Sequence, residues 1–296
     1  MKNAIFYYYH LNINTLIKKQ DQYEFDIDHN HYVFLPCPLP LEEIMKLYQL
    51  TLEMYQHQIP VHQMILNKDQ QFITYINQMP YLLLQVFVKR ETLILNDILR
   101  FQTQTSQISL NHLSKANWYQ WWTTKIDYLE YQMSEFGKKY PIIRESFSYY
   151  IGLAENAVSL LQNIPTEEFC LAHRRLYYNS TLFDLYNPLN FIVDSKVRDV
   201  AEYLKDCFFH NQEIMDSIQL YFSHQLLSGI EYQLFFIRFL FPSYYFDCYE
   251  TIIENGRPEK EILTITLKNE EFEQILKYLY QQVKNHIILP EIQWLK

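Results

Sequence analysis

The stretch AHRRLYYNSTLFDLYNPLNFIVDSKVRDVAEYLK, Ala172 to Lys205, decides the fold of this chain. Its last third has the pattern of an amphipathic helix, because Val200, Ala201 and Leu204 return to one helical face after the charged pair Arg198-Asp199. Before this helix lies a polar loop that holds one histidine, two arginines and three asparagines. The segment therefore predicts a loop rich in chemistry-bearing side chains that leads into a packed helix.

The first hundred residues have the pattern of a small mixed unit. Residues 22–36 alternate apolar and polar side chains around a polar break at 28–30, which predicts a β-hairpin, and residues 70–88 predict a second hairpin with Asn77-Gln78 as its turn. Between them, residues 41–56 have helical spacing. The residues expected on the buried face of this helix are Ile44, Leu47, Tyr48, Leu52 and Tyr55.

From about residue 111 the apolar pattern becomes helical. Trp118, Trp122 and Ile126 begin an amphipathic helix, with Ser114 as the expected N-cap and Trp121 off the apolar stripe. Further helical runs are expected at 146–163, 197–209, 211–227, 230–241 and 269–287. We expect two parts: an N-terminal one, 1–105, with hairpins and one helix, and a helical one, 106–296, that contains the loop region 170–199.

Composition excludes several classes of protein. The chain has 296 residues, is 49% hydrophobic and carries a net charge of -9, and no Lys/Arg run fits a phosphate backbone, so we expect no nucleic-acid partner. The most apolar stretch is interrupted by Arg238 and Pro242, so we expect no membrane insertion. The four cysteines lie far apart, as is typical of reduced thiols in a cytosolic protein. The 26 tyrosines have two explanations: an AT-rich genome, or adhesive groups in an assembly.

The order and spacing of three segments resemble the aminoglycoside phosphotransferase and choline kinase group. These segments are SYYIGLAENAVSLL at 148–161, LAHRRLYYNS at 171–180 and NPLNFIVDSKVRDVAEYLK at 187–205, with a weaker match at 229–250. Within the group, the chain is most similar to the spore-coat branch of Bacillus-type bacteria, the CotS and YutH-like coat proteins. The resemblance covers most of the chain and implies an α+β, bilobal protein-kinase-like fold, with a small mixed β-sheet N-lobe and a large helical C-lobe.

The catalytic loop that the resemblance implies begins at His173. Phosphoryl transfer in this fold uses an Asp to accept the proton of the attacking hydroxyl. That Asp is expected two residues after the histidine, where this chain has Arg175, and a guanidinium does not accept a proton near neutral pH. The loop Asn is expected at Ser180, and Asn179 is one residue short. The catalytic loop is therefore interpreted as degenerate.

The metal-binding Asp that the resemblance implies is also replaced. Counting back from the start of the helix, where Asp199 is the structural anchor of the loop in relatives, places it at Asn187, with Asn190 as the next polar candidate. An amide supplies an oxygen without negative charge, whereas magnesium prefers carboxylate. Asp184 is out of register, and Asp194 matches a structural turn position in relatives. We therefore expect no metal and no cofactor.

The N-terminal residues agree with this interpretation. Glycine lets a phosphate-binding loop approach its ligand closely, but the first glycine of this chain is Gly137. The Lys expected on the third strand falls in a stretch that reads Phe34, Leu35, Pro36. The acids of the helix that follows, Glu42, Glu43 and Glu53, consequently lack an evident lysine partner.

Two further clusters have two interpretations each. The sequence DIDHNH, 26–31, is compatible with a metal site, but turn chemistry at a hairpin tip is favoured. Arg174 and Arg175 are compatible with binding an anionic small ligand, but an ion pair with Asp184 or Asp194 is favoured.

The residues predict a pseudokinase, and the resemblance implies that it belongs to the spore coat. It would be made in the mother-cell cytoplasm and assemble on the coat with other spore coat proteins as partners. The alternative is an active small-molecule phosphotransferase, like the aminoglycoside and choline kinases, with relocated ligands: Asp184 or Asp194 for the metal and Asn179 in the loop. A third hypothesis is retained binding of an anionic ligand at Arg174 and Arg175 without turnover.

Overall fold

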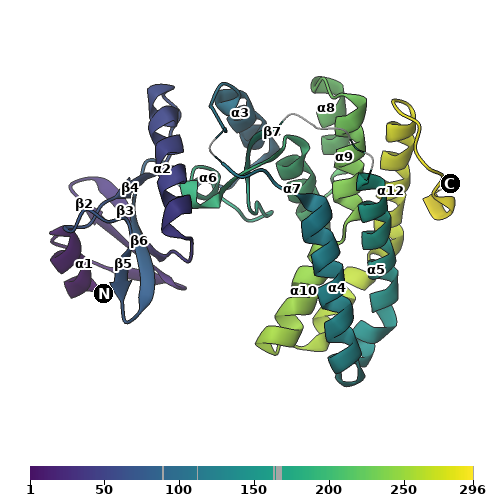
Figure 1. Cartoon of the computed structure of the whole chain (residues 1–296), viewed down its shortest axis with the longest axis horizontal. Helices are drawn as coiled ribbons and strands as arrows, with labels where there is room; N and C mark the ends of the chain where they lie inside the picture. The colour runs from purple at the N-terminus through teal and green to yellow at the C-terminus, as the bar shows by residue number, and fades with distance from the viewer. Residues whose placement is uncertain (89, 112, 163, 165–168, 296) are drawn as a thin grey trace. The chain divides into compact units, whose positions relative to one another are not determined.

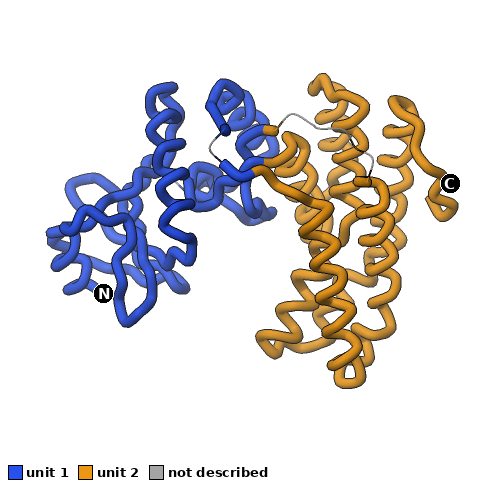
Figure 2. The backbone as a smooth tube through the Cα atoms, in the orientation of Figure 1, with its two compact units in different colours: residues 1–114, 170–193 blue, residues 115–169, 194–296 orange. Residues whose placement is uncertain are grey.

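The computed structural model describes residues 1–88, 90–111, 113–162, 164 and 169–295. The chain divides into two compact units (Figure 2). The first unit contains Met1–Ser114 and Cys170–Val193, and the second contains Lys115–Phe169 and Asp194–Lys296. Both helices and an antiparallel sheet are present, so the α+β class expected from the sequence is confirmed.

The first unit is built on a six-stranded antiparallel sheet (Figure 1). Its strands follow the order β1-β2-β3-β6-β4, and β5 pairs with the first residues of β6, Met79 to Tyr81, while β4 pairs with Leu83 to Gln85. Its elements are α1 (Lys2–Tyr9), β1 (Ile17–Lys19), β2 (Gln22–Ile27), β3 (Asn30–Pro36), α2 (Leu41–Gln56), β4 (Gln63–Ile65), β5 (Thr74–Ile76), β6 (Met79–Val86), α3 (Leu95–Thr105), α6 (Leu182–Leu185) and a 3-10 turn (Pro188–Asn190). The separate two-stranded sheet pairs β7 (Phe169–His173) with β8 (Phe191–Ser195).

Both predicted hairpins are confirmed, and their turns show how the chain manages without glycine. Asp28 and His29 join β2 to β3, and Asn77 and Gln78 join β5 to β6; all four residues have positive φ. Two consecutive positive φ angles match the right-handed twist of a two-residue hairpin, and Asp, Asn and His tolerate them better than most residues. His31 accordingly contacts Asp26 across the strand pair, with Nδ1 2.8 Å from Oδ1, so this cluster supplies turn chemistry.

The sheet is covered on one face by the N-terminal helix, which the sequence did not predict. Ile5 and Tyr9 of α1 pack against Phe25, Phe34 and Leu83 in one buried cluster. Tyr9 is also anchored through its hydroxyl, 2.9 Å from the Thr74 hydroxyl, and burial raises its pKa to about 12. Because Phe34 lies in this core, the third strand presents an aromatic side chain to the helix.

Helix α2 has the predicted bounds, and its predicted buried face is confirmed for Ile44 and Leu47 and wrong for the other three residues. The buried residues are Ile44, Leu47, Leu50, Thr51 and Met54. These positions recur every three or four residues and so form one stripe of a 3.6-residue helix. Leu52 is exposed, and Tyr48 and Tyr55 are half-buried, because they lie at the edge of that stripe or beyond it.

The second unit is helical (Figure 1). Its helices are α4 (Trp118–Phe136), α5 (Pro141–Leu161), α7 (Val197–Phe209), α8 (Met215–His224), α9 (Gly229–Leu240), α10 (Ser243–Asn255), α11 (Leu263–Thr266) and α12 (Asn269–Lys284), with 3-10 turns at Gly137–Lys139, Glu259–Ile262 and Gln293–Leu295. The predicted helical runs are therefore confirmed, although Asn163, at the end of one of them, lies outside the described residues.

The start of α4 corrects one expectation and confirms another. The N-cap is Asn117, whose Oδ1 accepts from the Gln120 N–H at 3.1 Å, rather than Ser114. Trp118 and Trp122 are buried and stacked, with ring centroids 5.3 Å apart. Trp121 is exposed, as its position off the apolar stripe predicted.

Two negative findings concern the described residues alone. The four cysteines, all within the described ranges, are not joined in disulfides; two of them are buried and two half-buried. Within the described ranges, none of the helices has the length and apolar character needed to cross a membrane.

Candidate functional site

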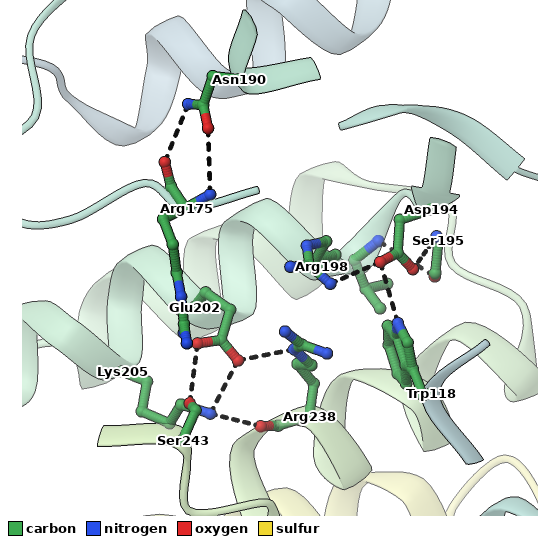
Figure 3. A network of polar contacts seen from close by, with 11 residues as sticks. Trp118, Arg175, Asn190, Asp194, Ser195, Arg198, Glu202, Lys205, Arg238 and Ser243 are labelled. Carbon is green, nitrogen blue, oxygen red and sulfur yellow. Dashed lines mark hydrogen bonds and ion pairs between the residues drawn. The ribbon is translucent and has the colours of Figure 1, made fainter. Parts of the chain in front are cut away.

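Strands β7 and β8 flank the loop that the sequence singled out, and Asn190 fastens the two ends of that loop together. The Arg174 N–H donates to the Asn190 carbonyl at 2.7 Å. The Asn190 amide then completes the clamp on Arg175 (Figure 3): Oδ1 accepts from the Arg175 N–H at 3.3 Å, and Nδ2 donates to the Arg175 carbonyl at 3.0 Å. The side chain of Asn190 thus satisfies backbone groups, which is a structural task.

His173 lies at the end of β7 and is buried. Its Nε2 is 2.8 Å from the carbonyl oxygen of Leu185, and its ring contacts Phe101 and Phe191. This arrangement holds the end of the strand against α6. The histidine consequently links the end of β7 to α6 through the Leu185 carbonyl.

The two residues expected near the loop asparagine position differ in environment. Ser180 is buried and closes a tight turn with Tyr177: its Oγ accepts from the Tyr177 N–H at 2.9 Å, and its own N–H donates to the Tyr177 carbonyl at 3.0 Å. Asn179, in the same turn, is exposed. Ser180 is therefore part of the loop's internal hydrogen bonding.

Asp184 and Asn187 both cap short helical turns. Asp184 Oδ2 accepts from the Thr181 N–H at 2.7 Å and from the Thr181 hydroxyl at 3.0 Å, a capping box at the start of α6. Asn187 Oδ1 accepts from the Leu189 N–H at 3.1 Å, at the start of the 3-10 turn. Both oxygens that the sequence analysis considered for metal binding therefore satisfy backbone N–H groups.

Asp194 lies near the end of strand β8, and its carboxylate is buried and hydrogen-bonded through both oxygens (Figure 3). Its Oδ2 accepts from Trp118 Nε1 at 3.0 Å and from Arg198 Nη1 at 2.6 Å, and its Oδ1 accepts from the Ser195 N–H at 2.7 Å. Arg198 is itself buried, so the negative charge of Asp194 is neutralised at close range in a dry environment. Asp199, the expected loop anchor, is buried in the first turn of α7.

The acids of α2 have partners that the sequence did not reveal. Glu43 forms an ion pair with Arg174, Glu42 pairs with Lys46 at 2.7 Å, and Glu53 accepts from the Ser109 N–H at 2.7 Å. The ion pair of a loop arginine with Asp184 or Asp194 stays a prediction, whereas the structure pairs Arg174 with Glu43. Asp184 and Asp194 accept hydrogen bonds from Thr181, and from Trp118 and Arg198, respectively. No short-range pattern could indicate the Arg174–Glu43 pair, whose members are 131 residues apart.

A second cluster that sequence analysis missed lies at the sheet. Glu24 of β2 is only 3% exposed, yet it accepts from Arg90 Nη2 at 2.7 Å and pairs with Lys19 at 2.8 Å. The guanidinium of Arg90 also stacks on Phe183, 4.2 Å from the ring centroid. Arg90 thus contacts both the carboxylate of Glu24 on β2 and the ring of Phe183 on α6.

His62, next to β4, links the sheet to α6 and is neutral. The Phe87 N–H donates to its Nδ1 at 3.4 Å, so the ring proton lies on Nε2, which donates to the Phe183 carbonyl at 3.1 Å. Burial lowers the pKa of His62 to about 4. A histidine in this state is a structural link, since both ring nitrogens are committed to backbone groups.

Taken together, the polar side chains of this region bind one another. Among the described residues, no group of three or more His, Cys, Asp or Glu side chains is placed to hold a metal ion. The residues brought together at the loop are Arg175 with Asn190, and His173 with α6. These contacts hold the loop in one conformation. The roles that the resemblance assigns to the individual site residues stay predictions.

Comparison with solved structures identifies the fold. The chain is similar to an aminoglycoside phosphotransferase from Alicyclobacillus acidocaldarius, with a TM-score of 0.69, 10% identity and 96% of each chain covered. It is also similar to spectinomycin phosphotransferase in an AMP-bound complex (TM-score 0.57, 11% identity, 89% of this chain and 96% of that one) and to an amicoumacin kinase (TM-score 0.55, 11% identity, 99% and 94%). The kinase-like fold is therefore shown.

Comparison with protein sequences identifies the family. A curated relative, the endospore coat-associated protein YutH of Bacillus subtilis, is 26% identical, and the match covers 61% of this chain and 61% of the relative. The family model described as "Spore coat putative kinase YutH" matches residues 2–286, nearly the whole sequence. The chain therefore belongs to the YutH family of kinase-like spore coat proteins.

Proposed function

We propose that this protein is a kinase-like protein without phosphotransfer activity that serves as a structural and binding component of the endospore coat. The coat role is supported by the family and by the name of the Bacillus subtilis relative, an endospore coat-associated protein. Under this proposal the protein is made in the mother-cell cytoplasm, assembles on the coat through contacts with other coat proteins and needs no nucleotide or metal.

The observation that carries the loss of activity is the environment of Asp194. A carboxylate that is to bind magnesium needs an uncompensated negative charge and open lone pairs. Here Arg198 supplies a positive charge 2.6 Å from Oδ2, and Trp118 and Ser195 use further acceptor sites of the same side chain. A divalent cation at this place would have to displace a buried guanidinium, which is unfavourable in charge and in hydrogen bonding.

The loop supports the same conclusion independently. Arg175 stands where the resemblance requires a proton acceptor, and Asn190 holds the backbone of Arg175 from both sides. Gln20 and Asp21 form a two-residue turn between β1 and β2, and no glycine is present to bring the backbone close to a phosphate. Several requirements of phosphoryl transfer are thus lost at positions far apart in the sequence.

The test is thermal melting of the purified protein with and without Mg-ATP. The proposal predicts that the melting temperature changes by less than about 1 °C, since a ligand stabilises only a state that binds it. The alternative, an active phosphotransferase, requires a shift of several degrees that Asp194→Asn or Asp184→Asn abolishes. Asp216→Asn, which removes an exposed acid on α8, is the matched control.

Two further measurements address the remaining hypotheses. If Arg174 and Arg175 bind an anionic ligand without turnover, inorganic phosphate or AMP should raise the melting temperature of the wild type but not of Arg175→Asp. A fluorescent fusion followed through sporulation tests the coat role separately. Uniform cytoplasmic fluorescence throughout spore formation would contradict the coat assignment.

A further inference from the structure

Helix α4 carries large aromatic side chains on its outer face. Trp121, Tyr128 and Tyr131 are 50%, 42% and 63% exposed. Trp121 and Tyr128 are seven residues apart, about two helical turns, and Tyr131 is one turn further, so the three rings follow one side of the helix. We call this surface the aromatic face of α4.

The aromatic face is not needed for the core of the second unit. The opposite side of α4 supplies that core through Trp118, Trp122, Ile126 and Leu129, which are all buried. Exposed aromatic side chains grouped on one surface are typical of interaction sites, where tyrosine and tryptophan contribute much of the binding energy. The face is therefore a candidate docking surface.

Acidic side chains surround the aromatic face. Asp127 and Glu135 of α4 are exposed beside it, and Glu254 of the adjacent helix α10 accepts from the Tyr128 hydroxyl at 3.3 Å. Lys125, the cation within α4, is paired with Glu250 of α10, and Lys138 and Lys139 follow the end of the helix. Within α4 itself, Asp127, Glu130 and Glu135 outnumber this lysine, so the helix carries net negative charge that a partner can neutralise.

The charge of the whole second unit has the same sign. The sequence of that unit contains 15 Lys and Arg against 23 Asp and Glu, whereas the first unit contains 10 against 11. Nearly all of the net charge of -9 consequently belongs to the unit that carries the aromatic face. Such a field attracts cationic partners and repels anionic ones.

We propose that the aromatic face of α4 docks a lysine- or arginine-rich segment of a partner protein. Lysine and arginine bind over aromatic rings, their aliphatic stems cover apolar surface, and their charges pair with carboxylates at the rim. A second copy of this chain does not fit, because its acidic rim would meet an identical acidic rim. The inference extends the proposed coat role by naming the chemistry of a partner.

The experiment measures binding of a fluorescein-labelled (Lys-Gly-Gly)4 peptide to the full chain by anisotropy, with the (Glu-Gly-Gly)4 peptide as the control ligand. Wild type should bind the lysine peptide and not the glutamate peptide. Asp127→Asn with Glu135→Gln should weaken binding roughly five-fold, because each surface ion pair contributes modestly. Trp121→Ala with Tyr131→Ala should weaken it roughly ten-fold, whereas Trp121→Phe should keep most of the affinity.

A matched control separates the face from overall charge. Asp216→Asn with Glu270→Gln removes two exposed acids on α8 and α12 and leaves the aromatic face intact. This variant should bind within about two-fold of wild type, because its substitutions lie on α8 and α12 and not on α4. Equal weakening by both charge variants, or no binding of the lysine peptide in low salt, would overturn the proposal.

One other result would also overturn the proposal. Sedimentation that showed a wild-type dimer, lost in Trp121→Ala with Tyr131→Ala, would assign the face to self-association. Substitutions of the face are all at exposed positions, so unchanged melting temperatures are the check that the variants fold. The peptide assay uses purified protein, and its result is therefore independent of whether a fluorescent fusion reaches the coat.

Discussion

Two carboxylates, one in each unit, are held by two cations each, and they differ in how far water reaches those cations. In the second unit, Glu202 Oε1 accepts from Lys205 Nζ at 2.9 Å and from Arg238 Nε at 2.6 Å, and its Oε2 accepts from the Ser243 hydroxyl at 3.0 Å (Figure 3). In the first unit, Glu24 is held by Arg90 and Lys19. The numbers of ionic partners are similar.

The burial of the partners separates the two clusters. The side chains of Lys205 and Arg238 are 2% and 6% exposed, whereas those of Lys19 and Arg90 are 52% and 30% exposed. The Lys205 ammonium also donates to two backbone carbonyls, at 2.7 and 3.0 Å, so its three protons are all used. The comparison shows that the helical unit keeps a fully satisfied buried ion network as scaffold, while the ions of the sheet stay near water.

The largest effect is expected for Glu202→Ala. The change leaves Lys205 and Arg238 buried without their carboxylate, and breaking a buried ion network in this way costs about 3–5 kcal/mol. Urea unfolding monitored by circular dichroism should show a loss of this size in the free energy of unfolding. A loss below about 1 kcal/mol would mean that water reaches these groups and that the contrast with Glu24 does not hold.

The second prediction concerns pH and tests a buried titratable group of the first unit. His62 has a pKa of about 4 when folded and an ordinary value near 6.5 when unfolded. Between pH 6.5 and pH 4 the unfolded chain binds a proton that the folded chain does not, so stability falls as the pH falls through this window, by up to about 3 kcal/mol. Above pH 6.5 and below pH 4 this contribution is constant.

The matched variant for this prediction is His62→Gln. Its amide can donate to the Phe183 carbonyl as Nε2 does, but it does not titrate. Urea midpoints of wild type and variant, measured from pH 7 to pH 4.5, should converge as the pH falls, because carboxylates contribute equally to both. Parallel curves would show that His62 is protonated in the folded chain.

Local pattern was sufficient to predict most of the elements. The hairpin at Gln22–Pro36, the helix Leu41–Gln56 and the helix Val197–Phe209 agree with the structure because each is specified by its own apolar period and turn residues. Helix α1 was missed, since its burial depends on a sheet formed by later residues. The short strands β7 and β8 were missed because each has five residues, too few to show a period.

For the candidate site, the sequence could predict only that a residue type is unable to perform a catalytic step. Arg175 in place of a proton acceptor is visible in the sequence alone. The partners of the remaining acids are not, because Arg174–Glu43, Trp118–Asp194 and Arg90–Glu24 join residues 66 to 131 positions apart. These contacts depend on how the chain folds back, and this is why the sequence could not indicate Glu43 as a partner of Arg174.

The third prediction tests whether Asp194 is a structural carboxylate like Glu202. Asp194→Asn keeps an acceptor for Trp118 but removes the negative charge 2.6 Å from the buried Arg198, so a loss of about 2 kcal/mol in the free energy of unfolding is expected. If Asp194 belongs to the scaffold, as Glu202 does, this loss is its main effect. The contrary result is a stable variant that has lost a Mg-ATP response present in wild type.

The smallest effect is expected for Glu24→Gln. The carboxylate of Glu24 is buried, but the ammonium of Lys19 and the guanidinium of Arg90 both reach water and can be hydrated when the carboxylate is lost. Pairs with exposed partners contribute little, so a loss of about 1 kcal/mol is expected, and 1 M NaCl should reduce the difference because salt screens exposed charges.

Glu202→Gln is the matched change in the other unit, and its loss should be larger and insensitive to salt. If the two glutamines cost the same, burial of the cations does not control the strength of these clusters, and the distinction between scaffold ions and ions near water fails. If Glu24→Gln instead creates a Mg-ATP response, the contact of Arg90 with Glu24 and Phe183 is what keeps nucleotide out of the first unit.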